Sequence, residues 1–337
     1  MRTFFFRAFV LILCVAVNAA AWFGLYVYMP VPGDDEVTVD IPKGAGVRRI
    51  KEILGEQGVI RDDFRFLLLA RLVKEGKRLR AGEFLVPLGL TPLQVLRFLD
   101  SARPVQYLVM VPEGRTMEQI AEIFAGDHWV DPEKFLQLCR DQMFIQGLGI
   151  TAETLEGYLF PETYTLVRGE VDEKSLITTM VKRFMTVWNG LDKPEDLQLE
   201  RHQLVTLASI VEKETGSAGE RTVIAGVFYN RLQKGMRLQS DPTTIYGLKH
   251  FNGNLTRADL KKETPYNTYV IAGLPPGPIC NPGRAALEAV LHPDEVPYYY
   301  FVSKNNGSHF FSATLKEHNR AVYTYQKSRQ KKKKQRK

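Results

Sequence analysis

The hydrophobic positions of this chain follow three successive patterns, and the first is an almost unbroken apolar run near the N-terminus. Ala8 to Tyr28 reads AFVLILCVAVNAAAWFGLYVY, in which Asn18 is the one strongly polar residue. A helix that spans a bilayer needs about 20 apolar residues. The run therefore predicts a single transmembrane helix over residues 8–29.

The charges that flank this run predict its orientation. Arg2 and Arg7 precede it, and no basic residue follows closely. Basic flanks stay in the cytoplasm, so we expect residues 1–7 there and the rest of the chain on the periplasmic or extracytoplasmic side of the inner (cytoplasmic) membrane. A cleaved signal peptide is the alternative, but its apolar core is usually shorter. We expect a retained single-pass anchor.

The second pattern is a repeat with an offset of 70 residues. Ile41-Pro-Lys-Gly44 and Val111-Pro-Glu-Gly114 each precede apolar residues at helical spacing. Each copy predicts a strand, a turn, an amphipathic helix and a second helix. Residues 82–86 (GEFLV) read as the closing strand of the first copy, whereas the second copy has no clear closing strand. This order resembles the LysM module, which binds glycans that contain N-acetylglucosamine. A plain α+β packing unit that binds nothing is the alternative.

The third pattern begins at residue 155, where helices alternate with long irregular segments. Residues 156–164 (EGYLFPETY) suit the wall of a groove, or equally a turn between two elements. Apolar spacing and turn residues predict helices over 173–188, 204–214, 218–232, 283–291 and 314–326, and a hairpin over 298–312. Irregular segments over 237–246, 265–269 and 273–283 lie between these elements. Such segments inside a compact domain are usually functional.

Together these patterns predict an α+β fold class with a single N-terminal transmembrane helix. We expect a LysM-like α/β subdomain over 36–105 and a second LysM-like repeat or connector over 106–154. A mixed α+β catalytic domain is expected over 155–326, followed by a basic tail over 327–337.

Composition changes this picture little. The chain has 337 residues, a net charge of +7 and a pI near 9.1. Eight of its basic residues lie in the tail, KSRQKKKKQRK, and the remainder is close to neutral. A nucleic-acid partner is therefore not expected. A basic terminal run is usually a solvated tail or a contact for an anionic surface.

Several kinds of catalytic site are excluded by the spacing of their residues. The six histidines are scattered, so no metal site is predicted. Cys139 and Cys280 match neither a metal nor a redox motif, and two separate buried thiols are expected rather than a disulfide. No phosphate-binding loop and no nucleophile elbow occur, and no cofactor is expected. Carboxylates among Tyr, Asn, Thr and Pro remain, and this combination suits sugar binding.

The helix over 204–214 offers two candidate acids. At about 100° per residue, Leu204, Leu207, Ala208 and Val211 form one buried stripe. Glu212 falls on one edge of this stripe, and Glu214 falls on the opposite edge. Apolar neighbours raise a carboxyl pKa, and a protonated Glu can act as a general acid. The helical wheel does not choose between the two, and a helix-edge Glu can also simply face solvent.

Several motifs resemble the YceG-like (MltG) family of endolytic murein transglycosylases. They are Val205–Thr215 (VTLASIVEKET), Asn230–Leu232 (NRL), Met236–Thr243 (MRLQSDPT), Tyr266–Tyr269 (YNTY), Gly273–Ile279 (GLPPGPI) and Asn281–Gly283 (NPG). The resemblance covers about the whole chain and is most specific over Leu155–Val322. It implies cleavage within peptidoglycan glycan strands, which leaves a 1,6-anhydro-N-acetylmuramyl end. The first Glu of the E-K-E-T run, here Glu212, is then the catalytic acid.

A lytic transglycosylase needs no second carboxylate, because the 6-hydroxyl of the substrate attacks the anomeric carbon. A hydrolase needs one, and Asp241 is the best candidate, more as a site-forming than as a catalytic residue. The expected substrate-binding residues are Ser240, Asp241, Tyr246, Tyr266, Asn267, Tyr269, Pro275 and Asn281.

The expected partners are peptidoglycan glycan strands and the inner membrane, and peptidoglycan synthases are candidates. Two alternative functions stay open. One is a peptidoglycan hydrolase (muramidase), and the other is a non-catalytic scaffold that binds the cell wall.

Overall fold

The computed structural model describes residues 2–73 and 81–327, and the chain forms two compact units. The first unit extends to Val109 and also includes Tyr164–Val171. The second comprises Met110–Thr163 and the chain from Asp172 onward. The chain therefore passes between the units three times. The expected domain boundaries stay predictions, and the basic tail over 328–337 lies outside the described residues.

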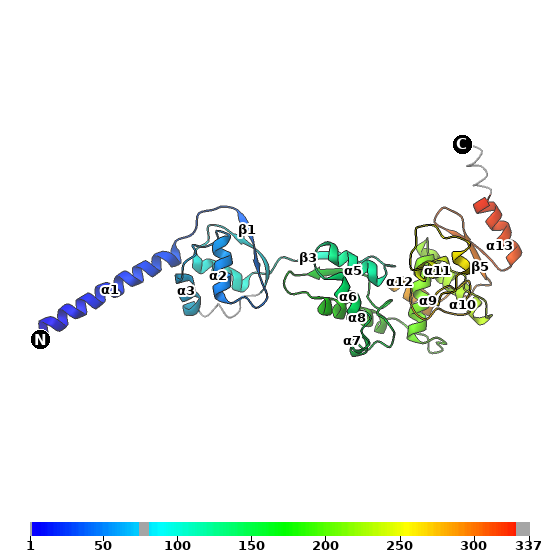
Figure 1. Cartoon of the computed structure of the whole chain (residues 1–337), viewed down its shortest axis with the longest axis horizontal. Coiled ribbons are helices and arrows are strands. Elements are labelled where there is room, and N and C mark those ends of the chain that lie inside the picture. Colours follow the sequence, from blue (N-terminus) through cyan, green and yellow to red (C-terminus); the bar gives the residue numbers. More distant parts are fainter. Residues whose placement is uncertain (1, 74–80, 328–337) are drawn as a thin grey trace, which may run out of the picture. The chain divides into compact units, whose positions relative to one another are not determined.

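The N-terminal apolar run is one continuous helix, α1 (Arg2–Tyr28), at the start of the first unit (Figure 1). It has 27 residues, and an 18-residue window within it has a mean hydropathy of 2.3. This helix is long and apolar enough to cross a membrane, which fits membrane anchoring. It begins at Arg2 rather than at Ala8, because the preceding residues, including three phenylalanines, continue the helical pattern.

Between α1 and Ser101, the first unit packs helices on one face of a two-stranded sheet. Its elements are β1 (Glu36–Ile41), α2 (Val47–Glu56), α3 (Arg65–Val73), β2 (Gly82–Pro87) and α4 (Pro92–Ser101). The strands pair antiparallel, with Val39 opposite Phe84. Both side chains are buried, while Leu85 points to the other face of the sheet. The predicted strand–helix–helix–strand order is present, and glycan binding by this subdomain stays a prediction.

The second copy of the repeat has a closing strand that the sequence did not reveal. Its elements are β3 (Tyr107–Met110), α5 (Met117–Gly126), α6 (Pro132–Leu138), α7 (Gln142–Gly147) and β4 (Thr163–Leu166). Strand β3 pairs with β4. The first copy reaches β2 soon after its second helix, whereas here α7 and the turns of residues 148–162 intervene. This insertion hides the equivalence of β4 and β2 in the sequence.

The remainder of the second unit is mostly helical and surrounds one buried helix, α9. Its elements are α8 (Glu173–Asn189), α9 (Arg201–Glu214), α10 (Arg221–Gln233), α11 (Asp241–Tyr246), α12 (Arg284–Leu291), β5 (Tyr300–Ser303), β6 (His309–Ser312) and α13 (Leu315–Val322). Single turns of 3₁₀-helix cover Ala218–Glu220 and Asp259–Lys261, and a π-helical turn covers Tyr323–Lys327. Strands β5 and β6 form the predicted hairpin, in which Asn305 and Gly307 adopt positive φ.

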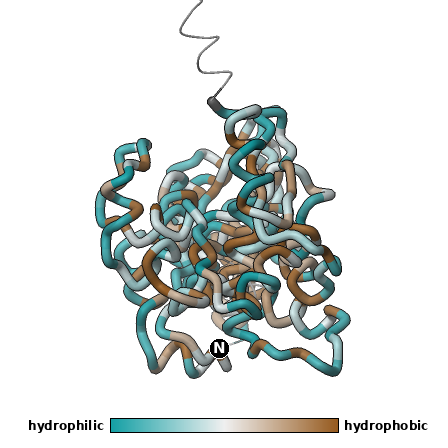
Figure 2. Tube along the Cα trace, turned by 90° about the vertical axis from the view of Figure 1, so that its right-hand side faces the viewer, coloured by the Kyte–Doolittle hydropathy of each residue, from teal (hydrophilic) through white to brown (hydrophobic). Residues whose placement is uncertain are grey.

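Helix α9 is more deeply buried than a single apolar stripe would make it. All residues from Leu204 to Val211 are buried, including Thr206 and Ser209. Their hydroxyl groups donate to backbone carbonyls of their own helix, which makes their burial tolerable. Helices α10, α11 and α12 pack against α9, and Figure 1 shows α9 among them. In Figure 2 the projecting loops are mainly hydrophilic, and hydrophobic positions concentrate inside.

Candidate active site

Glu212 lies near the end of α9, where the buried helix reaches a polar site. Its side chain is only 8% exposed. One carboxylate oxygen, Oε2, accepts a hydrogen bond from the backbone N–H of Gly283 at 3.0 Å. The other oxygen, Oε1, lies 3.6 Å from Nη2 of Arg221. A rigid, buried helix therefore holds this carboxylate against one amide donor and one guanidinium, and such donors stabilise a negative charge.

A second carboxylate, that of Glu113, lies beside Glu212. Its Oε2 is 4.0 Å from Nη2 of the same Arg221. Partial burial raises the pKa of Glu113, and the negative charge of Glu212 raises it further, while Arg221 opposes the shift. A carboxyl group beside a second negative charge is harder to ionise than an isolated one, so Glu113 is the group of this pair that holds its proton more readily than usual.

The loop that carries Glu113 is held against the residues before α12. Gly114 N–H donates to the carbonyl of Asn281 at 2.9 Å, and Asn281 N–H donates to the carbonyl of Arg115 at 2.8 Å. Lys213 Nζ donates to the carbonyl of Gly114 at 3.3 Å. A Cβ on Gly283 would lie 1.8 Å from Oε1 of Glu113. Only glycine at position 283 leaves room for Glu113 in this position.

Glu156 supports this loop from inside the protein. It is buried, and its carboxylate accepts hydrogen bonds from Met117 N–H at 3.1 Å, Asn281 Nδ2 at 2.9 Å and Tyr246 Oη at 3.1 Å. Burial, with a smaller contribution from the charge of Glu118, raises the pKa of Glu156 to about 8. Glu156 therefore links three segments that are far apart in sequence, and two of them continue from the residues beside Glu212, namely Glu113 and Gly283.

The sequence did not identify Glu113 or Glu156 as site residues, although it carried a signal for each. Glu113 stands in the second copy of the repeat where the first copy has Lys43. A departure of this kind within a repeat can mark a position with a separate role. Glu156 is the first residue of the aromatic stretch 156–164. The sequence suggests a groove wall or a turn for this stretch, but no role for its carboxylates.

The candidates Ser240, Asp241 and Tyr269 gather around Glu214 rather than Glu212. Ser240 Oγ donates to Oε1 of Glu214 at 2.6 Å, and Tyr269 Oη donates to Oδ1 of Asp241 at 2.6 Å. Burial raises the pKa of Glu214, and Asp241 adds to the increase, while the Ser240 hydrogen bond lowers it. Within the described residues, no hydrogen bond or ion pair joins this group to Glu212.

The predicted glycan-binding residues divide into an inward-facing and a partly accessible group. Ser240, Asn267, Pro275 and Asn281 are buried. Asn267 is fully engaged, because its Oδ1 accepts from Thr244 Oγ1 at 2.9 Å and its Nδ2 donates to the carbonyl of Lys262 at 2.7 Å. In this structure these four side chains are in contact with the surrounding protein rather than with solvent.

The other candidates retain accessible surface. Asp241 is exposed, and the side chains of Tyr246, Tyr266 and Tyr269 are half-buried. The rings of Tyr246 and Tyr266 lie 4.8 Å apart, tilted by 59°. Contact of any of these residues with substrate stays a prediction.

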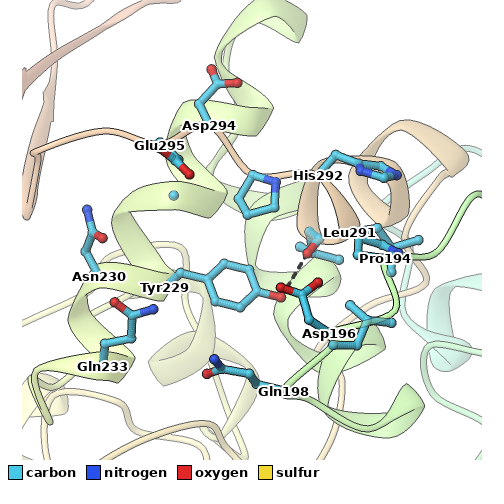
Figure 3. Close-up of a pocket in the computed structure, with 14 residues that line it drawn as sticks. Pro194, Asp196, Gln198, Tyr229, Asn230, Gln233, Leu291, His292, Asp294 and Glu295 are labelled. Carbon is cyan, nitrogen blue, oxygen red and sulfur yellow. Dashed lines mark hydrogen bonds between the residues drawn. The ribbon is translucent and has the colours of Figure 1, made fainter.

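A separate cleft of about 460 Å³ lies beside α10 and the segment after α12 (Figure 3). Tyr229 forms part of its wall, and its hydroxyl donates to the carbonyl of Val290 at 2.8 Å. None of the predicted site residues lines this cleft. Across residues 2–73 and 81–327, no group of three or more His, Cys, Asp or Glu residues is placed to hold a metal ion.

Comparisons with known proteins agree with the motifs around this site. The YceG-like family profile matches residues 39–324. An endolytic murein transglycosylase from Bacillus subtilis (strain 168) is 33% identical over 94% of this chain and 92% of its own length. One from Streptococcus pneumoniae (strain ATCC BAA-255 / R6) is 30% identical over 94% of this chain, which spans 65% of that protein.

A solved structure gives the same result. The crystal structure of a YceG-like protein from Listeria monocytogenes superposes with a TM-score of 0.60 at 34% sequence identity. The match covers 85% of this chain and 98% of the other.

Proposed function

The chain belongs to the YceG-like family and is a lytic transglycosylase, and from this premise we propose that Glu212 is its catalytic acid and base. The substrate is peptidoglycan, and the bond cleaved is the MurNAc–GlcNAc linkage within glycan strands. The observation that carries this proposal is the position of Glu212. It is the carboxylate that the buried helix α9 holds between an amide donor and a guanidinium, beside a second carboxyl group.

The reaction requires one proton to leave Glu212 and one to return. Glu212 protonates the oxygen of the leaving sugar as the glycosidic bond breaks. The 6-hydroxyl of the N-acetylmuramyl residue then attacks the anomeric carbon and gives its proton to the Glu212 carboxylate. The product is a 1,6-anhydro end, and no water is consumed. Arg221 and the Gly283 N–H stabilise the carboxylate between these two transfers.

Glu113 favours one alternative within the enzyme class. A glycoside hydrolase uses two carboxyl groups, and Glu113 is the carboxyl group that shares Arg221 with Glu212. In the lytic reaction, Glu113 instead helps to keep a proton available in the site. The two reactions differ in their products, since hydrolysis leaves reducing ends.

Membrane anchoring completes the proposal. Helix α1 anchors the chain in the inner membrane, and the catalytic unit lies on the periplasmic or extracytoplasmic side, where nascent strands emerge. Peptidoglycan synthases are then candidate partners. The accessible Tyr246, Tyr266, Tyr269 and Asp241 are proposed to contact the glycan, while Ser240, Asn267, Pro275 and Asn281 hold the segments around it.

Mass spectrometry of sacculi digested with the purified full chain tests this function. We expect new 1,6-anhydro ends from internal positions of the strands. New reducing ends would identify a hydrolase, and no new ends from a folded protein would identify a wall-binding scaffold. Either result would overturn the proposal.

A further inference from the structure

Helix α3 presents an apolar face to solvent that the proposed enzymatic function does not use. Phe64, which precedes the helix, and Leu68 and Leu72 follow each other at four-residue spacing. They are 59%, 44% and 69% exposed, respectively. The opposite face of α3 supplies buried side chains to the core of the first unit. Soluble proteins rarely leave a continuous row of large apolar residues uncovered, so this row indicates an interaction surface.

This row is continuous with the proposed membrane-spanning helix. The rings of Phe64 and Trp22 lie 5.7 Å apart. Arg65 Nη1 donates to the carbonyl of Trp22 at 2.9 Å, and its guanidinium lies over the rings of Trp22 and Tyr26. Tyr26 Oη donates to the carbonyl of Arg61 at 3.1 Å. Figure 1 shows α3 beside the C-terminal end of α1, on the side of the subdomain from which α1 extends.

The contacting residues mark the depth at which this junction lies. Tyr26 is about 29 Å along α1 from Arg7, the last residue expected in the cytoplasm, and this is close to the thickness of the hydrocarbon core. Tryptophan, tyrosine and arginine are the residues that concentrate at the boundary between hydrocarbon and water. The start of α3 is therefore fixed at the level of the outer interface if α1 spans the bilayer.

We propose that the face formed by Phe64, Leu68 and Leu72 lies in the outer interface of the bilayer that α1 spans. This inference rests on the proposed anchoring by α1. The occupant of the apolar row is lipid, because the row begins where Phe64 lies against Trp22 of the anchor and its side chains are large, apolar and exposed. The subdomain then contacts the membrane at two places, through α1 and through the apolar face of α3. These two contacts together fix its orientation relative to the bilayer.

A second copy of the chain and a glycan are the competing occupants. A glycan would require polar partners along the row, whereas the three side chains carry no polar atom. Another copy would cover the row with protein and exclude lipid. Depth-dependent quenching in vesicles distinguishes lipid from protein, because both bury a fluorophore but only lipid brings the quencher to it.

The test uses the full chain in phosphatidylethanolamine–phosphatidylglycerol vesicles, with an environment-sensitive fluorophore on one cysteine at a time. Cys14 is exposed on α1, whereas Cys139 and Cys280 are buried and will not be labelled. The wild-type label at Cys14 reports on anchoring. Leu68→Cys in a Cys14→Ala background reports on α3, and Leu85→Cys in the same background is the matched control. Leu85 is 49% exposed on the sheet face that points away from the helices.

We expect lipids brominated near the headgroup to quench the label at position 68 at least about twofold, and more strongly than deeply brominated lipids. Deeply brominated lipids should quench Cys14, and neither lipid should quench position 85. Quenching at Cys14 without quenching at position 68 would overturn the α3 proposal and leave the anchor intact. Equal quenching at 68 and 85, or a blue-shifted but unquenched label at 68, would also overturn it. No quenching at Cys14 would instead remove the anchoring premise.

Discussion

The two glutamates of the E-K-E run show how neighbouring side chains divide the roles of otherwise similar carboxyl groups. Glu212 faces Arg221 and the Gly283 N–H, and Glu113 lies beside it. Glu214 faces Ser240 and has a raised pKa because it is buried. We therefore propose that Glu212 exchanges a proton with substrate, whereas Glu214 accepts the Ser240 hydrogen bond that joins the start of α11 to α9.

The first prediction concerns these two residues. Glu212→Gln keeps the shape of the side chain but cannot transfer a proton, so anhydro-end formation should fall by roughly 10²–10⁴-fold or more. Glu214→Gln is the control, since its amide oxygen can still accept from Ser240. It should cost far less. Rates of anhydro-end formation measured by mass spectrometry decide the assignment, and reversed losses would move the catalytic role to Glu214.

The second prediction follows from the raised pKa of Glu156. Between its ordinary value of 4.5 and about 8, the folded protein binds a proton that the unfolded chain has released. Stability contributed by this proton is present below pH 4.5 and is lost as the pH rises towards 8. The loss should be on the order of a few kcal/mol, because one pKa unit corresponds to about 1.4 kcal/mol.

Urea denaturation at several pH values measures this effect. Glu156→Gln replaces the titrating group with a neutral one that can still accept from Met117 and Asn281, so its unfolding free energy should vary less over the same range. A variant with the same pH dependence as the wild-type protein would show that another group is responsible.

The sequence predicted the helix that carries the proposed catalytic acid, but not the other carboxyl groups near it. Helical spacing placed Glu212 and Glu214 on opposite edges of α9, and the resemblance chose between them. Glu113 and Glu156 lie far from α9 in sequence, so their proximity depends on tertiary contacts that no local pattern encodes. Asp241 was the best candidate for a second carboxylate, more as a site-forming than as a catalytic residue, and its carboxylate accepts a hydrogen bond from Tyr269.

The elements around the site were largely predictable because their periodicity is strong. Helices α8, α9, α10, α12 and α13 and the β5–β6 hairpin lie close to their expected positions. Strand β4 was missed because an extra helix separates it from its repeat. Helix α11 lies within the expected irregular segment 237–246 and was missed, because six residues are too few to show a helical period. The rest of the chain from Gly235 to Gly283 is largely irregular, and its conformation is set by specific bonds such as those of Asn267.

The third prediction concerns the junction between that segment and α12. Gly283 has φ −78° and ψ 172°, which alanine can adopt, but an added Cβ would lie 1.8 Å from Glu113. Gly283→Ala should therefore displace Glu113 while the fold is retained. We expect activity to fall by about 10²-fold, since a shift of about 1 Å in a catalytic site can cost that much.

Gly277→Ala is the matched control for this substitution. It lies in the same segment, its φ is not positive, and an added Cβ would meet no atom closer than 3.5 Å. It should retain near wild-type activity. Equal activity of the two variants, with unchanged melting temperatures, would show that the position of Glu113 does not matter for the reaction.

The arrangement of the whole molecule depends on the orientation of α1. The fourth prediction is that a reporter fused after Lys337 will be active outside the cytoplasm and inactive inside, because the basic residues of α1, Arg2 and Arg7, lie at its N-terminal end. A periplasmic alkaline phosphatase fusion and a cytoplasmic reporter fusion provide the two measurements. A cytoplasmic C-terminus would contradict the proposed function as a whole.

Retention of the anchor is checked by the mass of the mature protein. The intact chain should keep its N-terminal helix, because the apolar run is longer than the core of a typical signal peptide. A product shorter by about 30 residues would show that the segment is a cleaved signal.

The threefold passage of the chain between its two units limits how this protein can be recombined. Residues 164–171 belong to the first unit although they lie inside the sequence of the second. A gene fusion that joins a different N-terminal module before Met110 would carry these eight residues along without the rest of the unit to which they belong. Because the first unit is made of two separate stretches of sequence, no single cut in the gene separates the two units cleanly.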